Sequence, residues 1–531
     1  MGASLRAARA LVLLAGFYLL GLGMLALLGA IDWAATEWAP PSIFLKLYIV
    51  SALLAIPVVR GMFMLRTPKD EGMGGIPVTD AHEPRLWAAV RELAAEVGTR
   101  APDEIRLTAD MNAAVSEDAR LLGLVGGTRR LYLGLPLMAG LEEAQLRAVL
   151  AHEMGHYGNA DTRLSGITER GRVQVVRTIA HFEEKAGSTA AKERARQEKK
   201  AQKAVAKGKK AKEIDEGGAG FTYRVMARIY TAYAHFYMRA TLAGSRRQEL
   251  AADLAAARIA GRDATASALR EIPVLDAAHG FYLESYATLG TEFGLLPPQG
   301  EVFGGVRRLL AARSEELDEL RRELPTEPSS PYDSHPSMAE RVARIEALPD
   351  DGRAAEPARP ALGLLEAPDQ ALAAIERAVL TDEALGFRRL DWPELVHESM
   401  TGFFERDAEP LRRATAQVTG APTLAALLDA IDRGDSGRIA DLLPKSEEAR
   451  AATGRAAREF ARPVLRRGLS RLVAVEFVRD GRGRWQLSWS DAATLRLPHG
   501  YEEELPAALD AAVAERPDTE PLRKLLAPVA S

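Results

Sequence analysis

His152-Glu153-Met154-Gly155-His156 lies inside a stretch, residues 141–157, that has helical spacing of apolar side chains and contains no proline. Two histidines four positions apart on a helix lie on one face, so their imidazoles can converge on a single tetrahedral cation. Glu153 would lie beside the first histidine, where a carboxylate can take a proton from water and later return it. Such a string arises by chance in about one per cent of chains this long, and its helical context favours a functional zinc site.

A catalytic zinc site needs a third protein ligand and an open fourth position. The segment SRRQELAAD at residues 245–253 places Glu249 and Asp253 one helical turn apart on one face. Taken alone, two such acids usually belong to a solvated face. Together with the histidine motif, they predict that Glu249 binds the metal. Asp253 would accept the free ring N–H of a ligand histidine and fix its orientation.

The length and composition of the chain limit the other classes of protein. At 531 residues the chain is too long for one compact core, so we expect two or three domains. Lys and Arg number 69 against 73 Asp and Glu, and this near balance gives no indication of a nucleic-acid partner. Cysteine is absent, which excludes disulfides and thiolate ligands and leaves histidine and carboxylate to bind a metal.

Two apolar stretches at the N-terminus predict a membrane anchor. Residues 10–31 contain no charge and are long enough to cross a hydrocarbon core of about 30 Å. Residues 43–65 are also apolar, apart from Lys46 and Arg60, which can extend toward the interfaces. We therefore expect a transmembrane helical hairpin in a lipid bilayer over residues 1–66. A cleaved signal peptide is the alternative, but the positions before Ile31 lack a clean small-x-small cleavage pattern, and the second apolar stretch follows closely.

Charge predicts the orientation of this hairpin. Basic residues flank both of its outer ends, whereas the connection between the apolar stretches contains Asp32 and Glu37. By the positive-inside rule, both ends and the catalytic domain lie in the cytoplasm. An exported enzyme with the opposite topology remains an alternative.

We expect the first soluble domain to span residues 67–350. Residues 67–84 are rich in Gly and Pro and predict a linker, and residues 82–98 predict a helix. Short strand-like runs follow, with Gly126-Gly127 as a tight turn, and they predict a small antiparallel sheet. These runs are residues 105–108, 111–115, 121–125 and 130–133.

An insertion at residues 185–218 consists almost entirely of Lys, Arg, Glu, Gln and Ala, so it cannot bury a core face. A solvated helix or loop is the favoured interpretation, and attraction to an anionic membrane leaflet is the sharper one. Residues 221–243 and 249–260 predict two further helices, the first with too many charges to cross a membrane. It carries an aromatic stripe that we expect in the core: Tyr230, Tyr233, Phe236 and Tyr237.

The rest of the chain contains less information about function. Residues 325–332 predict a loop and residues 337–348 a short helix, followed by a linker at residues 350–360. Residues 351–531 predict a mostly helical C-terminal domain of unknown role that contains no chemical motif. Its strand candidates are residues 474–478 and 485–489.

The two metal-binding segments, with the sequence from about residue 104 to residue 348, resemble the family of HtpX and the CAAX prenyl protease, metallopeptidase family forty-eight. The resemblance implies a membrane zinc metallopeptidase that holds one zinc ion per chain. Its zincin-like domain would be mainly α-helical with a small antiparallel β-sheet. Relatives of the HtpX type generally have further membrane helices between the two motifs, where this chain has the charged insertion.

The resemblance also extends to residues outside the metal motifs. Asn112-Ala113-Ala114 resembles the family segment on the strand that borders the substrate cleft, which implies that Asn112 and Ala113 bind substrate backbone. Ser334-His335-Pro336 with Arg341 resembles a late family element, which implies that His335 and Arg341 stabilise an oxyanion. On the residues alone, a histidine before proline is usually surface structure, and an asparagine near a strand often marks only a turn.

These observations predict a membrane-anchored zinc metalloendopeptidase that acts on peptides or proteins, with a role in membrane protein quality control implied by resemblance. The alternative is a non-catalytic membrane scaffold that retains a structural zinc. Glu153 argues against the scaffold, because a structural site needs no general base. The sequence leaves the substrate and the oligomeric state open.

Overall fold

The computed structural model describes residues 3–38, 40–63, 74–117, 127–158, 160–205, 221–326, 336–353, 357–444 and 446–527. The chain is mainly helical and forms two compact units that alternate along the sequence. The first consists of Met1–Val274 and Leu320–Glu366, and the second of Leu275–Glu319 and Ala367–Ser531. Leu275–Glu319 therefore belongs with the C-terminal residues, whereas the sequence predicted a boundary at position 350.

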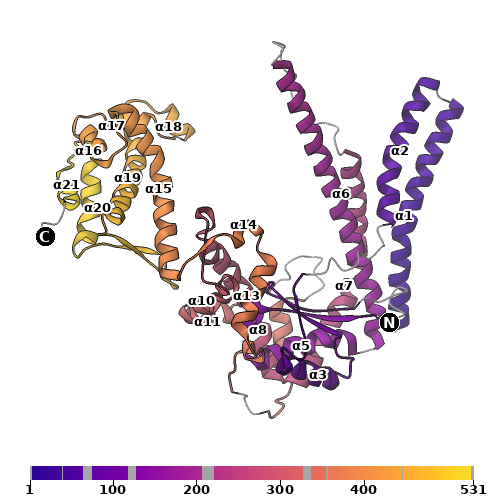
Figure 1. Ribbon diagram of the computed structural model, residues 1–531. Helices are drawn as coiled ribbons and strands as arrows, with labels where there is room; N and C mark the ends of the chain where they lie inside the picture. The colour runs from indigo at the N-terminus through magenta and orange to yellow at the C-terminus, as the bar shows by residue number, and fades with distance from the viewer. Residues whose placement is uncertain are drawn as a thin grey trace. The chain divides into compact units, whose positions relative to one another are not determined.

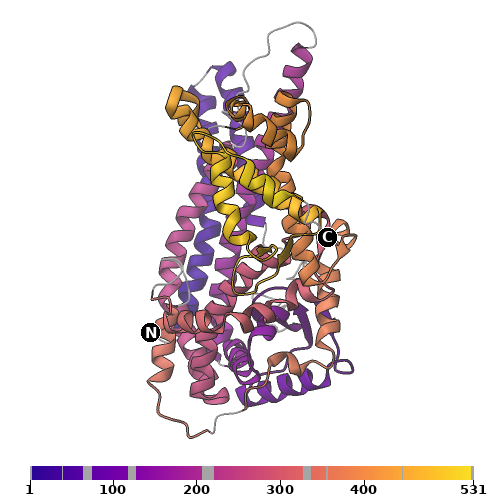
Figure 2. The same cartoon turned by 90° about the vertical axis from the view of Figure 1, so that its left-hand side faces the viewer.

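Four long helices of the first unit share one apolar core (Figure 1, Figure 2). They are α1 (Ala3–Trp38), α2 (Pro41–Phe63), α6 (Ala160–Val205) and α7 (Phe221–Ala260). The helices predicted at residues 221–243 and 249–260 form one continuous helix, α7. The predicted charged insertion is helical as far as Val205, and residues 206–220 lie outside the described residues.

The aromatic stripe of α7 only partly belongs to the core. Tyr230 and Tyr237 are fully buried, as predicted, whereas Phe236 is 60% exposed. Phe236 precedes Tyr237 by one position, which turns its side chain about 100° around the helix and away from the packed face.

The helix α1 contains one stretch, Ala15–Trp38, that is long and apolar enough to cross a membrane, and α2 contains a shorter apolar stretch, Ile43–Ile56. The two helices pack on each other, and the Ser51 hydroxyl of α2 donates a hydrogen bond to Asp32 of α1 at 2.8 Å. One such stretch is weak support for a membrane anchor, and crossing by both helices stays a prediction.

The main sheet is mixed, so the prediction of an antiparallel sheet was wrong for one strand pair. The order is β1-β2-β4-β3, and β2 pairs with β4 in parallel while the other two pairs are antiparallel. β4 lies between β2 and β3 and has the most buried side chains, which accounts for its central place. The strands are β1 (Ile76–Val78), β2 (Glu104–Thr108), β3 (Ala113–Glu117) and β4 (Arg129–Gly134).

The sheet differs from the sequence prediction at β1, and one predicted strand falls outside the described residues. β1 lies inside the predicted linker at residues 67–84, because three residues that include Pro77 show too little periodicity, and an edge strand tolerates proline. The strand predicted at residues 121–125 lies outside the described residues.

The remaining elements of the first unit are short helices, and one of them, α8, continues past Val274 into the second unit. Helix α3 packs against α5, and the predicted helix at residues 337–348 is confirmed as α12, whose cap residue Ser337 accepts the Glu340 N–H. These elements are α3 (Pro84–Val97), α4 (Leu135–Gly140), α5 (Glu143–Gly158), α8 (Arg262–Tyr282), α12 (Met338–Glu346) and η4 (Ala361–Leu364).

The second unit has its own apolar core. Residues 474–478, predicted as a strand, lie inside a helix, because Val473 and Phe477 bury their side chains in that core and packing overrides strand propensity. The elements are η2 (Leu283–Ala287), η3 (Thr291–Phe293), β5 (Leu295–Leu296), α9 (Glu301–Gly304), α10 (Val306–Ala312), α11 (Ser314–Arg322), α13 (Pro368–Val379), α14 (Asp382–Leu385), β6 (Arg388–Arg389), α15 (Trp392–Thr419), α16 (Leu424–Asp432), α17 (Ser436–Asp441), α18 (Glu447–Ala451), α19 (Gly454–Arg479), β7 (Arg484–Gln486), β8 (Thr494–Arg496), α20 (Tyr501–Ala512) and α21 (Glu520–Leu526).

A close approach at Gly134 holds the start of β3 against the end of β4. A Cβ atom at Gly134 would lie 1.8 Å from the Asp110 carbonyl oxygen and 2.8 Å from that of Asn112. We expect Gly134→Ala to lower the free energy of unfolding by about 1–3 kcal/mol, as overpacking does. Chemical denaturation should show this loss for Gly134→Ala and none for Gly363→Ala, whose site is exposed with no heavy atom within 4 Å. Equal effects of the two changes would contradict the close approach.

Candidate metal centre

The metal-binding motifs meet where α5 packs against α7 through small side chains. A Cβ atom at Gly155 would lie 3.5 Å from Ala252 Cα and 3.5 Å from Ala255 Cβ, which is ordinary van der Waals contact. Larger side chains at these positions would hold the two backbones farther apart. The sequence analysis assigned no role to Gly155, although a glycine between two ligand histidines could have indicated a close helix contact.

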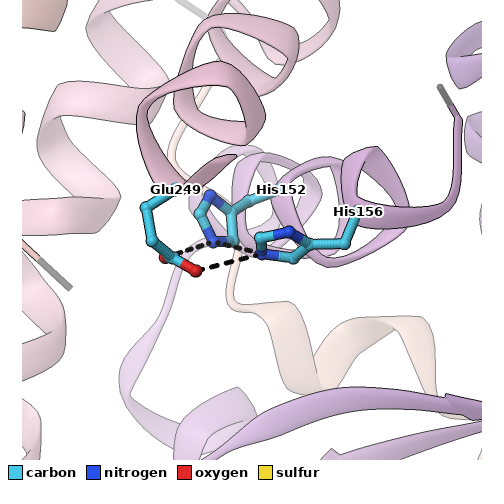
Figure 3. Close-up of side chains that lie close together, drawn as sticks. All are labelled: His152, His156 and Glu249. Carbon is cyan, nitrogen blue, oxygen red and sulfur yellow. Dashed lines mark hydrogen bonds and ion pairs between the residues drawn. The ribbon is translucent and has the colours of Figure 1, made fainter. Parts of the chain in front are cut away.

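His152, His156 and Glu249 come together at this crossing (Figure 3). The two Nε2 atoms are 3.3 Å apart, His152 Nε2 is 3.5 Å from Glu249 Oε2, and His156 Nε2 is 3.6 Å from Glu249 Oε1. Donor atoms that each lie about 2.1 Å from a tetrahedral ion are about 3.4 Å apart. Two imidazole nitrogens and a carboxylate at these separations fit a zinc ion.

Asp253 holds the ring of His152 from the side opposite these converging atoms. His152 Nδ1 lies 2.9 Å from Asp253 Oδ1, so the ring N–H donates to the carboxylate and the Nε2 lone pair is left for a metal. Arg341 of α12 donates from Nε to Asp253 Oδ2 at 2.9 Å and from Nη2 to Oδ1 at 2.7 Å. All three side chains are buried, so this chain of hydrogen bonds fixes the orientation of the ring.

The same contacts shift the pKa values of the site. Burial disfavours the charged ring of His152, but its hydrogen bonds with Asp253 and Glu249 outweigh burial and raise its pKa to about 9. Burial also raises the pKa of Asp253, but the hydrogen bonds from Arg341 and His152 outweigh it and lower that pKa below its ordinary value. Asp253 is therefore a carboxylate at neutral pH, and His152 carries a proton where no metal competes for it.

Glu153, the predicted general base, is half-buried beside these groups. Its negative charge is among the causes that raise the pKa of His152 and of Arg341. Its carboxylate therefore lies within electrostatic range of the site, as the adjacent position on α5 predicts.

Asn112 and Ala113 lie at the open edge of the sheet, since β3 pairs only with β4 among the described strands. Gly134 N–H donates to the Asn112 carbonyl at 2.8 Å, and Ala113 faces Leu133 in the register. Facing residues in an antiparallel pair alternate between hydrogen-bonded and non-hydrogen-bonded pairs, so the Ala113 N–H and C=O point away from β4. β3 also contacts α5, so this edge is on the side of the histidine helix.

His335 lies outside the described residues, and its role stays a prediction. Arg341 is near the metal ligands, but its guanidinium binds Asp253, and this contact supports a positioning role. The predicted action of Arg341 on an oxyanion also stays a prediction.

Gln145 is a positioning residue that the sequence analysis missed. Its Oε1 accepts the Glu142 N–H at 2.9 Å, and its Nε2 donates to Ser267 Oγ at 2.8 Å, which joins the start of α5 to α8. A Gln three positions after a helix start can cap the helix, and this local signal could have identified its first role but not its link to Ser267.

Comparison with known proteins adds one finding. The model of peptidase family M48 matches residues 80–348, slightly more than half of the chain and a range that includes both metal-binding motifs. The searches of curated proteins and of solved structures found no match. The extent of the family match shows that the chain belongs to peptidase family M48 and is a metallopeptidase.

Proposed function

We propose that this metallopeptidase is a membrane-anchored, zinc-dependent endopeptidase that holds one zinc ion between His152, His156 and Glu249. The convergence of two Nε2 atoms and one carboxylate is the observation that carries the proposal. When bound, zinc polarises the carbonyl of the scissile peptide bond and lowers the pKa of water.

The protein's own residues would perform the proton transfers. A carboxylate oxygen of Glu153 would take the proton of the attacking water and give it to the nitrogen of the leaving amine. Asp253 and Arg341 would keep His152 in the tautomer and orientation that a metal requires. His335 would donate a hydrogen bond to the developing oxyanion, as the family resemblance implies.

The edge of β3 supports an extended peptide as the substrate. The outward N–H and C=O of Ala113 can add a substrate strand to the sheet, which binds main chain and demands no chain end. This is why we propose an endopeptidase.

Membrane anchoring would use α1 and α2, whose large apolar side chains are widely exposed. The membrane would place proteins of the bilayer, or unfolded chains near it, within reach, in keeping with a role in quality control. The cytoplasmic orientation stays a prediction from charge.

Glu153→Gln should reduce kcat on an unfolded protein substrate by about 10²–10⁴-fold, the usual contribution of a positioned general base. Zinc content, measured by atomic absorption, should be unchanged, because Glu153 is not among the three converging ligands. The matched control is Glu143→Gln at the start of the same helix. Bound zinc without any Glu153-dependent cleavage would favour the structural scaffold instead.

Zinc binding to the metal-free protein at pH 7 should release protons, because His152 has a pKa of about 9 and must give up its proton. Zinc affinity should therefore rise as the pH increases toward about 9. Titration calorimetry in two buffers of different ionisation enthalpy measures the released protons.

Asp253→Asn should reduce this proton release, because a neutral amide supports the charged ring less well. It should also weaken zinc binding by about 10–100-fold, as loss of a ligand-orienting carboxylate does. Asp263→Asn, on the exposed start of α8, is the control and should change neither quantity. Wild-type proton release in Asp253→Asn would contradict the contribution of Asp253 to the pKa of His152.

The full chain should float with vesicles of phosphatidylcholine and phosphatidylglycerol in a density gradient. Leu22→Lys with Leu53→Lys should reduce the floating fraction severalfold, because both side chains are more than half exposed and a charge is costly among acyl chains. Leu320→Lys, at an exposed leucine of α11, should float like the wild type. A wild-type chain that remains at the bottom would contradict the anchor.

A further inference from the structure

The bundle formed by α1, α2, α6 and α7 has two unlike faces. α1 and α2 present large apolar side chains to the outside, and nine of those described are each more than half exposed, among them Leu19, Leu22, Leu27, Leu45, Ile49 and Leu53. Exposed apolar surface of this extent is typical of a binding surface. α6 presents charged side chains instead.

The aromatic contacts in the core give the register between α1 and α6. Tyr230 of α7 contacts both Phe17 and Phe182, with ring centroids 5.0 Å and 5.5 Å apart. Phe17 of α1 and Phe182 of α6 therefore lie at the same level, and from there the two helices extend in the same direction (Figure 1). Because every helix rises by about 1.5 Å per residue, Lys192 of α6 is level with Leu27 of α1, and Lys203 is level with Trp38.

The charged part of α6 is thus level with the stretch of α1 that could cross a membrane, Ala15–Trp38, although the two helices diverge toward these ends (Figure 1). Residues 192–203 contain two glutamates and six basic side chains, Lys192, Arg194, Arg196, Lys199, Lys200 and Lys203, all six exposed. Along the described length of α6, the last buried residue is Ala186. Within the helix, Glu198 pairs with Arg194 at 3.2 Å and Glu193 lies 3.8 Å from Arg196, so the two glutamates only partly balance the six basic side chains.

An upright bundle surrounded by lipid would therefore place these charges at hydrocarbon depth. Each charged residue at the centre of a bilayer opposes insertion several times more strongly than one leucine or isoleucine favours it. The apolar face of α1 and α2 can reach lipid without this cost if the bundle lies along the membrane with α6 on its water side. A body with one apolar and one charged face is typical of attachment in the interface.

We propose that the bundle binds the acyl region of one leaflet through α1 and α2, while α6 stays in water on the same side as the metal centre. The α1–α2 connection then remains on that side and does not cross the bilayer. This inference rests on the membrane attachment proposed above and replaces the predicted crossing hairpin. It also places the peptidase against the surface whose proteins it would cleave.

The absence of cysteine from the chain allows a direct test. The double variant Ala95→Cys with Glu37→Cys places one cysteine at an exposed site on α3, in the catalytic part, and a second at an exposed site near the end of α1. Full-length protein in sealed vesicles of phosphatidylcholine and phosphatidylglycerol is treated with a membrane-impermeant maleimide. Intact mass spectrometry then counts the labels on each molecule. Two labels or none on each molecule are expected, whichever way the protein inserted, and molecules with one label would overturn the proposal.

A second measurement compares the labelling rates of two cysteines, one on α6 and one on α1, that lie at the same level along the bundle. In vesicles opened by a protein pore, Lys192→Cys should react with the same maleimide at least tenfold faster than Leu27→Cys. Equal protection of the two sites would overturn the proposal. Only vesicle-bound protein is analysed after flotation, so failure of membrane attachment appears beforehand, and peptidase activity does not enter the result.

Discussion

The Asp253 carboxylate joins three segments that lie far apart in the sequence. It accepts the ring N–H of His152 and two donors of Arg341, and it is 1% exposed. Removal of one partner from such a buried pair leaves an uncompensated charge and costs about 3–5 kcal/mol. The contact therefore constrains α5, α7 and α12 together, and the positions of His152 and Glu249 depend on it.

The same arrangement sets up a competition between a proton and a metal. The acids that orient His152 also raise its pKa to about 9, so the site binds a proton tightly when it holds no metal. A divalent metal would bind Glu249 and both histidines at once, which a single proton cannot do. The small side chains at Gly155 and Ala252 permit this close arrangement, because they let Glu249 approach from α7.

The sequence predicted those parts of the site that depend on local spacing. His152 with His156, and Glu249 with Asp253, are pairs one helical turn apart, and a helix alone brings each pair onto one face. The helix after Ser337 was predictable for the same reason, since its cap is local. The pairing of Arg341 with Asp253 is set by tertiary packing, which no local pattern contains.

The predictions that the structure contradicts also failed because they depended on tertiary packing. Strand-like patterns do not specify direction, so the parallel pairing of β2 with β4 was missed, and residues 474–478 are helical because the core of the second unit favours it. The transmembrane hairpin is not among these failures and stays a prediction, because one stretch of α1 that could cross a membrane is weak support for it.

The C-terminal residues belong to the second unit, and the family match covers only part of that unit. Leu275–Glu319 lies within the matched range, yet it packs with residues beyond position 366. Val302 N–H donates to the fully buried Glu376 at 2.7 Å, and Trp392 donates to Glu301 at 3.0 Å. A chain that ended near residue 350 would expose these polar groups and the apolar side chains around them. The C-terminal residues therefore complete the core around Leu275–Glu319, a segment within the matched range.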